Sequence, residues 1–390
     1  MMPEKAKSKP QVVCGFESSN IHNVSEIAPG HFRCEMRPDE PSMYEYPDHH
    51  GYWFLLKLEN ARDETITIDI TNCSWMPSHW KSYRPVVTYL DPNELDSHVY
   101  DAVDDACVMG RTFRFRHAYG GNEAWVSLSY PYTYSYHQKY LEFVERSTFV
   151  RRETILVTKE GRKLDCVTVS DFAAEPACKK KIVVFAREHA VEQAGSWVCK
   201  GLVDFLASTD EAAVRLRRTS EFLVIPMTMP DAAYHGRCTD PRTGGILAID
   251  FRNGGGEMLM DEAKAIWRKV LAFAGEGQVD ICISLHSPHG CEENIWSHLH
   301  GSIRYQDGKK LNRAIFLRAD GLTKRGPESS WGKYSLPGKC AREFGSVAML
   351  LEINQHARRS FLTLQSLCGI GETISRGIAD YYKQGTDIET

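Results

Sequence analysis

The chain of 390 residues contains no apolar run that approaches the ~20 residues a membrane-spanning helix needs. Its first segment is polar and has no apolar signal core, so we expect residues 1–12 to be a disordered terminus. The net charge of −4 is small, and no basic stripe is interleaved with aromatic residues. We therefore expect neither a membrane nor a nucleic acid as a partner.

The sequence also lacks closely spaced cysteine pairs. Its twelve cysteines are scattered, and no C-x-x-C motif suggests a structural zinc or redox site. Several of them, including Cys199 and Cys282, lie in apolar stretches, which favours reduced thiols over a disulfide framework. This cysteine usage predicts a cytoplasmic protein, whereas the sequence leaves the oligomeric state open.

Strand and helix patterns divide the chain into two domains, which its length accommodates. In the first third, apolar runs such as 53–58 and 65–70 are separated by clusters of Asp, Asn, Pro and Gly, and the second run alternates with period two. We predict a small antiparallel β-sandwich domain at residues 13–138. Strands and helices alternate after it, which predicts an α/β domain at residues 139–390.

The H-x-x-E spacing of His189 and Glu192 is the most informative motif. It directly follows a strand-like run at residues 181–186 and opens an expected helix. Residues three apart on a helix share one face, so this imidazole and this carboxylate can reach the same small cation. Zinc accepts such ligands, and a catalytic zinc takes three protein ligands and keeps one position open. On its own, H-x-x-E also fits a solvated helix surface.

His286 and Glu352 are candidates for completing this site. His286 follows the strand-like run 280–285, and Glu352 ends the apolar run 347–352. Ligands of open α/β sheets bind at the carboxyl ends of strands, where His189 is also expected. A charge at the end of a buried strand is costly without a partner or a task, and general-base catalysis is such a task. The alternatives are two unrelated histidines and a glutamate paired with a nearby arginine.

In this order, the four residues resemble the functional set of the zinc metallocarboxypeptidases. His189 and Glu192 match the H-x-x-E ligands of the family, His286 matches its third ligand, and Glu352 matches its catalytic glutamate. Four segments of the first domain resemble the β-rich leading domain of the cytosolic carboxypeptidase branch. They are Phe16-Glu17-Ser18-Ser19-Asn20, Arg37-Pro38-Asp39, Tyr52-Trp53-Phe54 and Tyr130-Pro131-Tyr132-Thr133-Tyr134.

The resemblance implies a fold and a chemistry. The α/β domain is expected to hold a mixed, mostly parallel, eight-stranded sheet flanked by helices, preceded by the β-sandwich. One zinc ion is expected on the three ligands, with Glu352 as the base that activates water. The segment His235-Gly236-Arg237-Cys238 looks like the one that supplies a transition-state arginine, so Arg237 is expected to offset charge on the carbonyl oxygen. The implied substrates are peptide or protein C-termini, with acidic residues favoured.

Substrate binding is where the sequence departs from the family pattern. The family usually carries Asn-Arg in a segment that grips the terminal carboxylate, whereas this chain has the order Arg252-Asn253. A guanidinium binds a carboxylate in a bidentate way that an amide cannot match. Either a one-residue shift restores Arg252 to the pocket, with Asn253 beside it, or carboxylate capture is altered. Tyr334, in the loop before the Glu352 strand, is a further substrate-binding candidate.

The specificity and the reaction class therefore have alternatives. A group of cations before the catalytic strand either forms a pocket for acidic side chains or is a solvated loop; it comprises Lys324, Arg325, Lys333, Lys339 and Arg342. The altered Arg252-Asn253 order also suits a zinc amidase or deacylase acting on a small acylated amine. A non-catalytic metal-binding interaction module is a third possibility, against which the complete set of three ligands and Glu352 argues.

Overall fold

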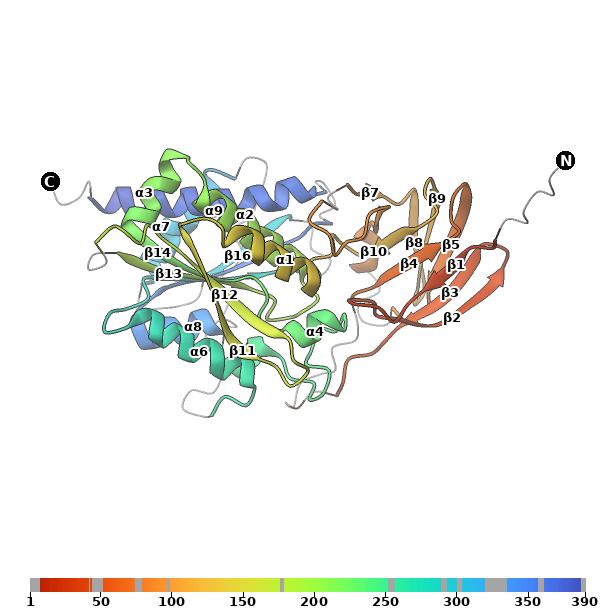
Figure 1. Cartoon of the computed structure of the whole chain (residues 1–390), viewed down its shortest axis with the longest axis horizontal. Coiled ribbons are helices and arrows are strands. Elements are labelled where there is room, and N and C mark those ends of the chain that lie inside the picture. Colours follow the sequence, from red (N-terminus) through yellow and green to blue (C-terminus); the bar gives the residue numbers. More distant parts are fainter. Residues whose placement is uncertain are drawn as a thin grey trace.

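A computed structural model describes most of the chain and shows a β-rich part beside an α/β part (Figure 1). The described residues are 8–41, 43, 52–73, 79–96, 99–175, 179–251, 257–288, 293–299, 304–319, 335–356 and 361–386. Among the helices of these ranges, none is both long enough and apolar enough to cross a membrane.

The N-terminal part consists of two five-stranded sheets. The first has the order β1 (Gln11–Val13), β4 (Leu55–Glu59), β10 (Ala124–Ser127), β6 (Val86–Thr88) and β7 (Asp101–Ala102). The second has the order β2 (Ile21–Ala28), β3 (His31–Met36), β5 (Glu64–Ile70), β9 (Thr112–Tyr119) and β8 (Asp105–Met109). The expected sandwich is present, and the strand pairs among its described residues are antiparallel except for the parallel pair β3–β5. Strand β1 starts two residues before the expected domain start at residue 13.

The core of this part follows from the period-two pattern of its strands. Ile66, Ile68 and Ile70 are fully buried on one face of β5, as alternation predicts. The rings of Phe54 and Phe115 stack in the same core, with centroids 5.6 Å apart. A short 3-10 helix, His79–Ser82, lies against this region through Trp80.

The α/β part is built on one mixed sheet. Its order is β11 (Val150–Val157), β12 (Lys163–Val169), β14 (Ser220–Ile225), β13 (Lys180–Ala186), β15 (Ile281–His286), β17 (Val347–Ile353) and β16 (Ile295–Leu299). The described residues thus give seven strands where eight were expected. Only the pairs β13–β14, β13–β15 and β15–β17 are parallel, because both edges of the sheet are formed by antiparallel pairs. The sheet is therefore mixed, and parallel pairing is confined to its centre.

Helices cover both faces of this sheet (Figure 1). They are α1 (Tyr134–Val144), α2 (Gln193–Ala207), α3 (Glu211–Thr219), α4 (Pro230–Tyr234), α5 (Leu247–Asp250), α6 (Asp261–Ala274), α7 (Tyr305–Phe316), α8 (Leu336–Phe344) and α9 (Leu364–Thr386). Helices α2 and α9 lie on one face, and α6 and α8 lie on the other. The expected domain boundary between residues 138 and 139 falls inside α1.

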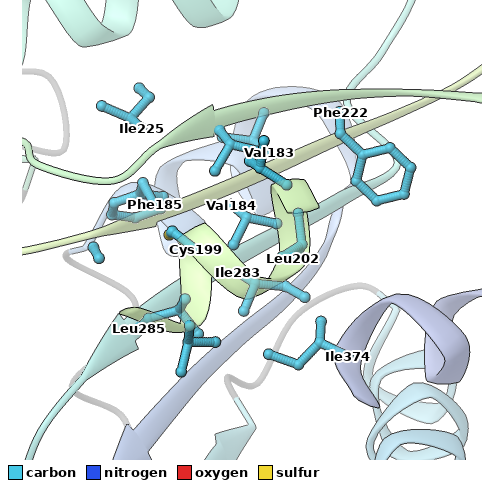
Figure 2. Close-up of a cluster of buried hydrophobic side chains, with 14 of the residues drawn as sticks. Val183, Val184, Phe185, Cys199, Leu202, Phe222, Ile225, Ile283, Leu285 and Ile374 are labelled. Atoms are coloured by element: carbon cyan, nitrogen blue, oxygen red, sulfur yellow. The ribbon is translucent and has the colours of Figure 1, made fainter. Parts of the chain in front are cut away.

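The central strands are apolar along their whole length, as parallel strands covered on both faces must be. Val183, Val184 and Phe185 of β13 are fully buried and pack with Ile283 of β15 and Leu202 of α2 (Figure 2). Burying side chains of this size contributes roughly 1.5–3 kcal/mol each. This rigid layer holds the carboxyl ends of the central strands in place.

Helix ends are set by local chemistry. Asp210 caps α3, because its carboxylate accepts a 2.8 Å hydrogen bond from the backbone N–H of Ala212. Helix α8 ends at Gly345, which adopts the left-handed conformation (φ 68°) that glycine tolerates best. This stop turns the chain directly into β17, the strand that carries Glu352.

Helices α2 and α9 cross at unusually small separation, and two glycines permit it. A Cβ atom at Gly201 would overlap the backbone of Cys368, and one at Gly371 would overlap the backbone of Leu202 and Val198. In contrast, a Cβ at Gly369 of the same helix α9 would meet no atom within 4 Å. The crossing therefore requires glycine at position 371 and not at position 369.

We predict that Gly371→Ala lowers the free energy of unfolding by about 1–3 kcal/mol or more, because backbone atoms cannot move aside for the added methyl group. Gly369→Ala is the matched control, and it should be neutral or stabilising by up to ~1 kcal/mol, because alanine is the better helix former. Denaturant unfolding of both variants measures the difference. Equal unfolding free energies would contradict the close crossing.

Candidate metal centre

Three neighbouring parallel strands bring the candidate residues to one edge of the sheet. The register pairs Ala186 of β13 with Leu285 of β15, and His286 of β15 with Glu352 of β17. Side chains at paired positions of parallel strands point to the same face, so His286 and Glu352 are direct neighbours. His189 follows the end of β13 by three residues. The expected convergence at the carboxyl ends of the strands is therefore present.

His189 and Glu192 come together through a turn rather than along one face of a helix. The backbone N–H of Glu192 donates to the carbonyl of His189 (3.1 Å), and α2 begins only at Gln193. Glu192 is the N-cap residue of that helix. The expectation that the motif lies within the helix is wrong by one turn, and the reason is that the chain must reverse from β13 into α2 at this point. The partial positive charge of the helix terminus favours the Glu192 carboxylate there.

The three candidate ligands surround one small space. Glu192 Oε1 lies 3.0 Å from Nδ1 of His189, and Glu192 Oε2 lies 3.0 Å from Nδ1 of His286. One ligand atom from each residue can be chosen so that all of them lie within 4.8 Å of one another. The two imidazole rings have centroids 5.2 Å apart and are inclined by 70°. One carboxylate thus faces both imidazole Nδ1 atoms.

The charged groups of this cluster lower the pKa of Glu192 and raise the pKa of His286. Burial alone would raise the pKa of Glu192, but His189 and His286 hold it well below its ordinary value. Burial likewise opposes charge on His286, yet Glu192 and Glu188 raise the pKa of its imidazole well above the usual value. In the metal-free cluster, Glu192 and His286 thus favour each other's charged forms. Metal binding, which needs an unprotonated Nδ1, therefore competes with protonation of His286.

The donor set fits zinc. Two ligands of a tetrahedral zinc, each at about 2.0–2.2 Å, lie about 3.4 Å apart, which is close to the two separations of 3.0 Å. Two imidazole nitrogens and one carboxylate oxygen are a common ligand set of catalytic zinc sites, which keep a fourth position open. Glu352 does not belong to this ligand group, which the described residues define as His189, Glu192 and His286.

Glu352 lies beside the candidate ligands, opposite His286 in the strand register. Its Oε2 atom is shielded from solvent and has no hydrogen-bond partner among the described residues. Burial raises the pKa of Glu352 to about 7, with Glu192 adding to the effect and His286 opposing it. A carboxyl group with a pKa near neutrality is well suited to exchange protons with a substrate.

Two functional candidates escaped sequence analysis, and both precede His189. Arg187 is completely buried, adopts a left-handed backbone (φ 73°) that is uncommon for residues other than glycine, and donates hydrogen bonds to Ala190 O and Gln193 Oε1. It thus ties together both ends of the turn that carries the H-x-x-E motif. Burial lowers the pKa of Arg187 to about 9. Glu188, also completely buried, contacts His286.

The proposed substrate residues are only partly visible. Arg237 is directed toward the N-terminal part, where its guanidinium donates to the carbonyl of Pro38, and burial lowers its pKa while Asp39 opposes that change. Its catalytic role stays a prediction. Arg252, Asn253 and Tyr334 lie outside the described residues. Of the expected basic group, Lys339 pairs with Glu343 (3.6 Å) within α8 and lies over the ring of Trp267.

The N-terminal part contributes to the surroundings of the metal centre. A cavity that borders Glu192 is lined on one side by Tyr52, Trp53 and Tyr83 of the N-terminal part, and on the other by Ser287 and His356. The contact between the two parts is intimate, because Val191, inside the H-x-x-E motif, belongs to the apolar core of the N-terminal part. Cys238 belongs to this core too, and its N–H donates to Asp39 (2.8 Å). The two domains therefore share the wall of the site.

Comparison with known families agrees with this geometry. The model of the zinc carboxypeptidase family matches residues 120–242, and the model of the cytosolic carboxypeptidase N-terminal domain matches residues 12–130. Each match covers about a third of the chain. The chain is therefore similar to the zinc carboxypeptidases at the start of its α/β part, and to the cytosolic carboxypeptidases in its N-terminal part.

Relatives and solved structures extend this assignment. Cytosolic carboxypeptidase 2 of Danio rerio is 25% identical over 335 residues, covering 77% of this chain and 44% of the relative. Cytosolic carboxypeptidase 6 of Homo sapiens is 28% identical over 240 residues, covering 57% of this chain and 46% of the relative. The chain therefore spans less than half the length of these relatives.

The fold matches solved structures over nearly its whole length. A metallo-carboxypeptidase from Burkholderia cenocepacia superimposes with a TM-score of 0.82 at 20% identity, covering 96% of this chain and 100% of that chain. A metallo-carboxypeptidase from Pseudomonas aeruginosa, solved with (2-guanidinoethylmercapto)succinic acid, gives a TM-score of 0.81 at 18% identity, with 96% and 99% covered. At these identities the likeness establishes the fold.

We predict that Glu352→Gln changes the stability of the metal-free protein in a pH-dependent way. Because the folded pKa of Glu352 (about 7) exceeds its unfolded value of 4.5, folding favours the protonated form. The wild-type free energy of unfolding should therefore decrease as pH rises from 4.5 to 7, and the variant should escape this loss. Above pH 7 the variant should be more stable by up to about 3 kcal/mol, and near pH 4 the two should be similar.

Denaturant unfolding across this pH range measures the effect, with Glu142→Gln on the exposed face of α1 as the control. A stability difference between Glu352→Gln and wild type that does not vary with pH would contradict the raised pKa.

Proposed function

We propose that this chain is a zinc-dependent metallocarboxypeptidase that hydrolyses the C-terminal peptide bond of peptides or proteins. The observation that carries the proposal is the convergence of His189, Glu192 and His286 within 4.8 Å, with Glu352 in register beside His286. The two family matches support the same reaction. The chain spans less than half the length of the two relatives named above. The proposed reaction is therefore argued from the metal site of this chain and not from the activity of those relatives.

The three ligands would hold one zinc ion. When bound, zinc supplies Lewis-acid polarisation of the scissile carbonyl and of water at its open position. Nδ1 of His189 and Nδ1 of His286 both lie next to the Glu192 carboxylate, so one metal ion can contact all three side chains. The apolar walls of the central strands limit access of bulk water from beneath the site.

Glu352 would act as the base and then as the acid. Its Oε2 atom has no hydrogen-bond partner among the described residues, so this oxygen is open to a proton from water. Its raised pKa lets it take a proton from water and pass it to the leaving amine near neutral pH.

The remaining roles follow from residue type. Arg237 would offset negative charge on the carbonyl oxygen, for which it has to leave its contact with the Pro38 carbonyl. Arg252, with Asn253, would hold the terminal carboxylate of the substrate, and Tyr334 would close over it. Acidic C-terminal residues are the proposed preference. The free state of all ten described cysteines and the names of the relatives support a cytoplasmic location.

We predict that Glu352→Gln keeps zinc and lowers the turnover number by roughly 10²–10⁴-fold on peptides, because the general base is lost while the ligands remain. His189→Ala should lose both zinc and turnover. Zinc content and peptide hydrolysis are measured on the same preparations. Wild-type turnover in Glu352→Gln would show that the base is another residue.

A zinc amidase or deacylase is the second candidate, and the exchanged Arg252-Asn253 order favours it. We predict that peptides ending in Glu, Lys or Phe are cleaved faster than N-acyl amino acids, with Glu preferred. Rates on this panel, at equal enzyme and zinc concentration, decide between the two reactions. Faster hydrolysis of the N-acyl amino acids would replace the carboxypeptidase assignment, and zinc binding without turnover on any substrate would favour the interaction module.

A further inference from the structure

Glu188 is a buried carboxylate directly behind the metal centre. It follows Arg187, precedes His189, and has no solvent exposure. A carboxylate in such a place is costly unless charged or hydrogen-bonding partners compensate it. Its described partners all lie on β15, a strand 96 or more residues further along the chain.

Both of these partners bind the same carboxylate oxygen. Ser284 Oγ donates to Glu188 Oε2 (2.6 Å), and His286 Nε2 lies 2.9 Å from that oxygen. Ser284 and His286 are two residues apart on β15, so their side chains point to the same face of the sheet. Glu188 therefore engages His286 through the ring nitrogen that faces away from Glu192.

The two nitrogens of His286 consequently have separate partners. Nδ1 faces Glu192 Oε2 at 3.0 Å, inside the candidate metal centre, and Nε2 faces Glu188. A neutral imidazole whose Nε2–H donates a hydrogen bond to a carboxylate has an unprotonated Nδ1, and the lone pair of that nitrogen can bind a cation. The carboxylate fixes the orientation of the ring and makes the other nitrogen a better donor to a metal.

We propose that Glu188 is a positioning residue that orients and strengthens His286 as a metal ligand. The side chain of His286 is 4% exposed, whereas that of His189 is 26% exposed. Glu188 therefore acts on the more deeply buried of the two imidazole ligands. This inference rests on the metal site of the proposed function, and it does not depend on the reaction that the site performs.

The test is the zinc affinity of the full chain, measured by competition with a chromophoric chelator at fixed pH. Glu188→Gln removes the charge and keeps the shape, and it should weaken zinc binding about five- to tenfold. Glu188→Leu removes the hydrogen bond as well, and it should weaken binding by about 10–100-fold. Ser284→Ala is the matched control, because it removes the other hydrogen bond to the same oxygen; its zinc affinity should stay within about threefold of wild type.

A second measurement separates action through His286 from a general effect of negative charge. In the zinc-loaded chain, Glu188→Gln should change the ¹⁵N chemical shifts of the His286 ring nitrogens and leave those of His189 close to wild type, because only His286 contacts Glu188. Unchanged His286 shifts would overturn the proposal, as would wild-type zinc affinity in Glu188→Gln. Thermal unfolding of the metal-free variants checks that each is folded, and Glu188→Gln decides the matter if Glu188→Leu is not.

Failure of this inference is distinguishable from failure of the proposed function. A wild-type chain that binds no zinc contradicts both. A wild-type chain that binds zinc, with Glu188 variants that bind it equally well, contradicts only the role of Glu188.

Discussion

The placement of one carboxylate between two imidazoles is the interaction on which the rest of this site depends. Glu192 faces Nδ1 of His189 and Nδ1 of His286, and each separation is 3.0 Å. Three parallel central strands make this possible, because their carboxyl ends lie at one edge of a sheet that is buried on both faces. A shift of one residue between β15 and β17 would turn Glu352 away from His286, so the strand register is also a functional constraint.

The N-terminal domain is part of this arrangement. Val191 lies between two metal-ligand candidates and packs into the core of that domain. The indole N–H of Trp53 donates a hydrogen bond to the carbonyl of Ser18. The backbone N–H of Ser18 in turn donates to the carbonyl of Tyr234 in the α/β domain. The turn that carries the H-x-x-E motif is thus held by Arg187 from within the α/β domain and by Val191 from the other side. The division at residues 138 and 139 remains a proposal, since α1 spans it.

The sequence predicted the four residues at the centre because each ends or follows an apolar strand and carries a side chain with a clear chemical use. It predicted less well what depends on tertiary contacts. The helical placement of His189 was wrong, because a turn precedes α2. The contact between Glu188 and His286 joins residues 98 positions apart, so no local pattern reveals it. The only local signal for Glu188 was that two charged residues, Arg187 and Glu188, lie between an apolar strand and the candidate ligand His189. Within the described residues the sheet has seven strands rather than eight, and its edge strands pair antiparallel, which a local apolar pattern does not predict.

The central claim is that a single zinc ion is bound by two imidazole nitrogens and a carboxylate oxygen. X-ray absorption at the zinc edge of the zinc-loaded chain tests it most directly. The account predicts nitrogen and oxygen scatterers only, at about 2.0–2.2 Å, in four- or five-fold coordination. A sulfur scatterer at about 2.3 Å would instead place the metal on cysteine, such as the buried Cys238, and would contradict the assignment of the site.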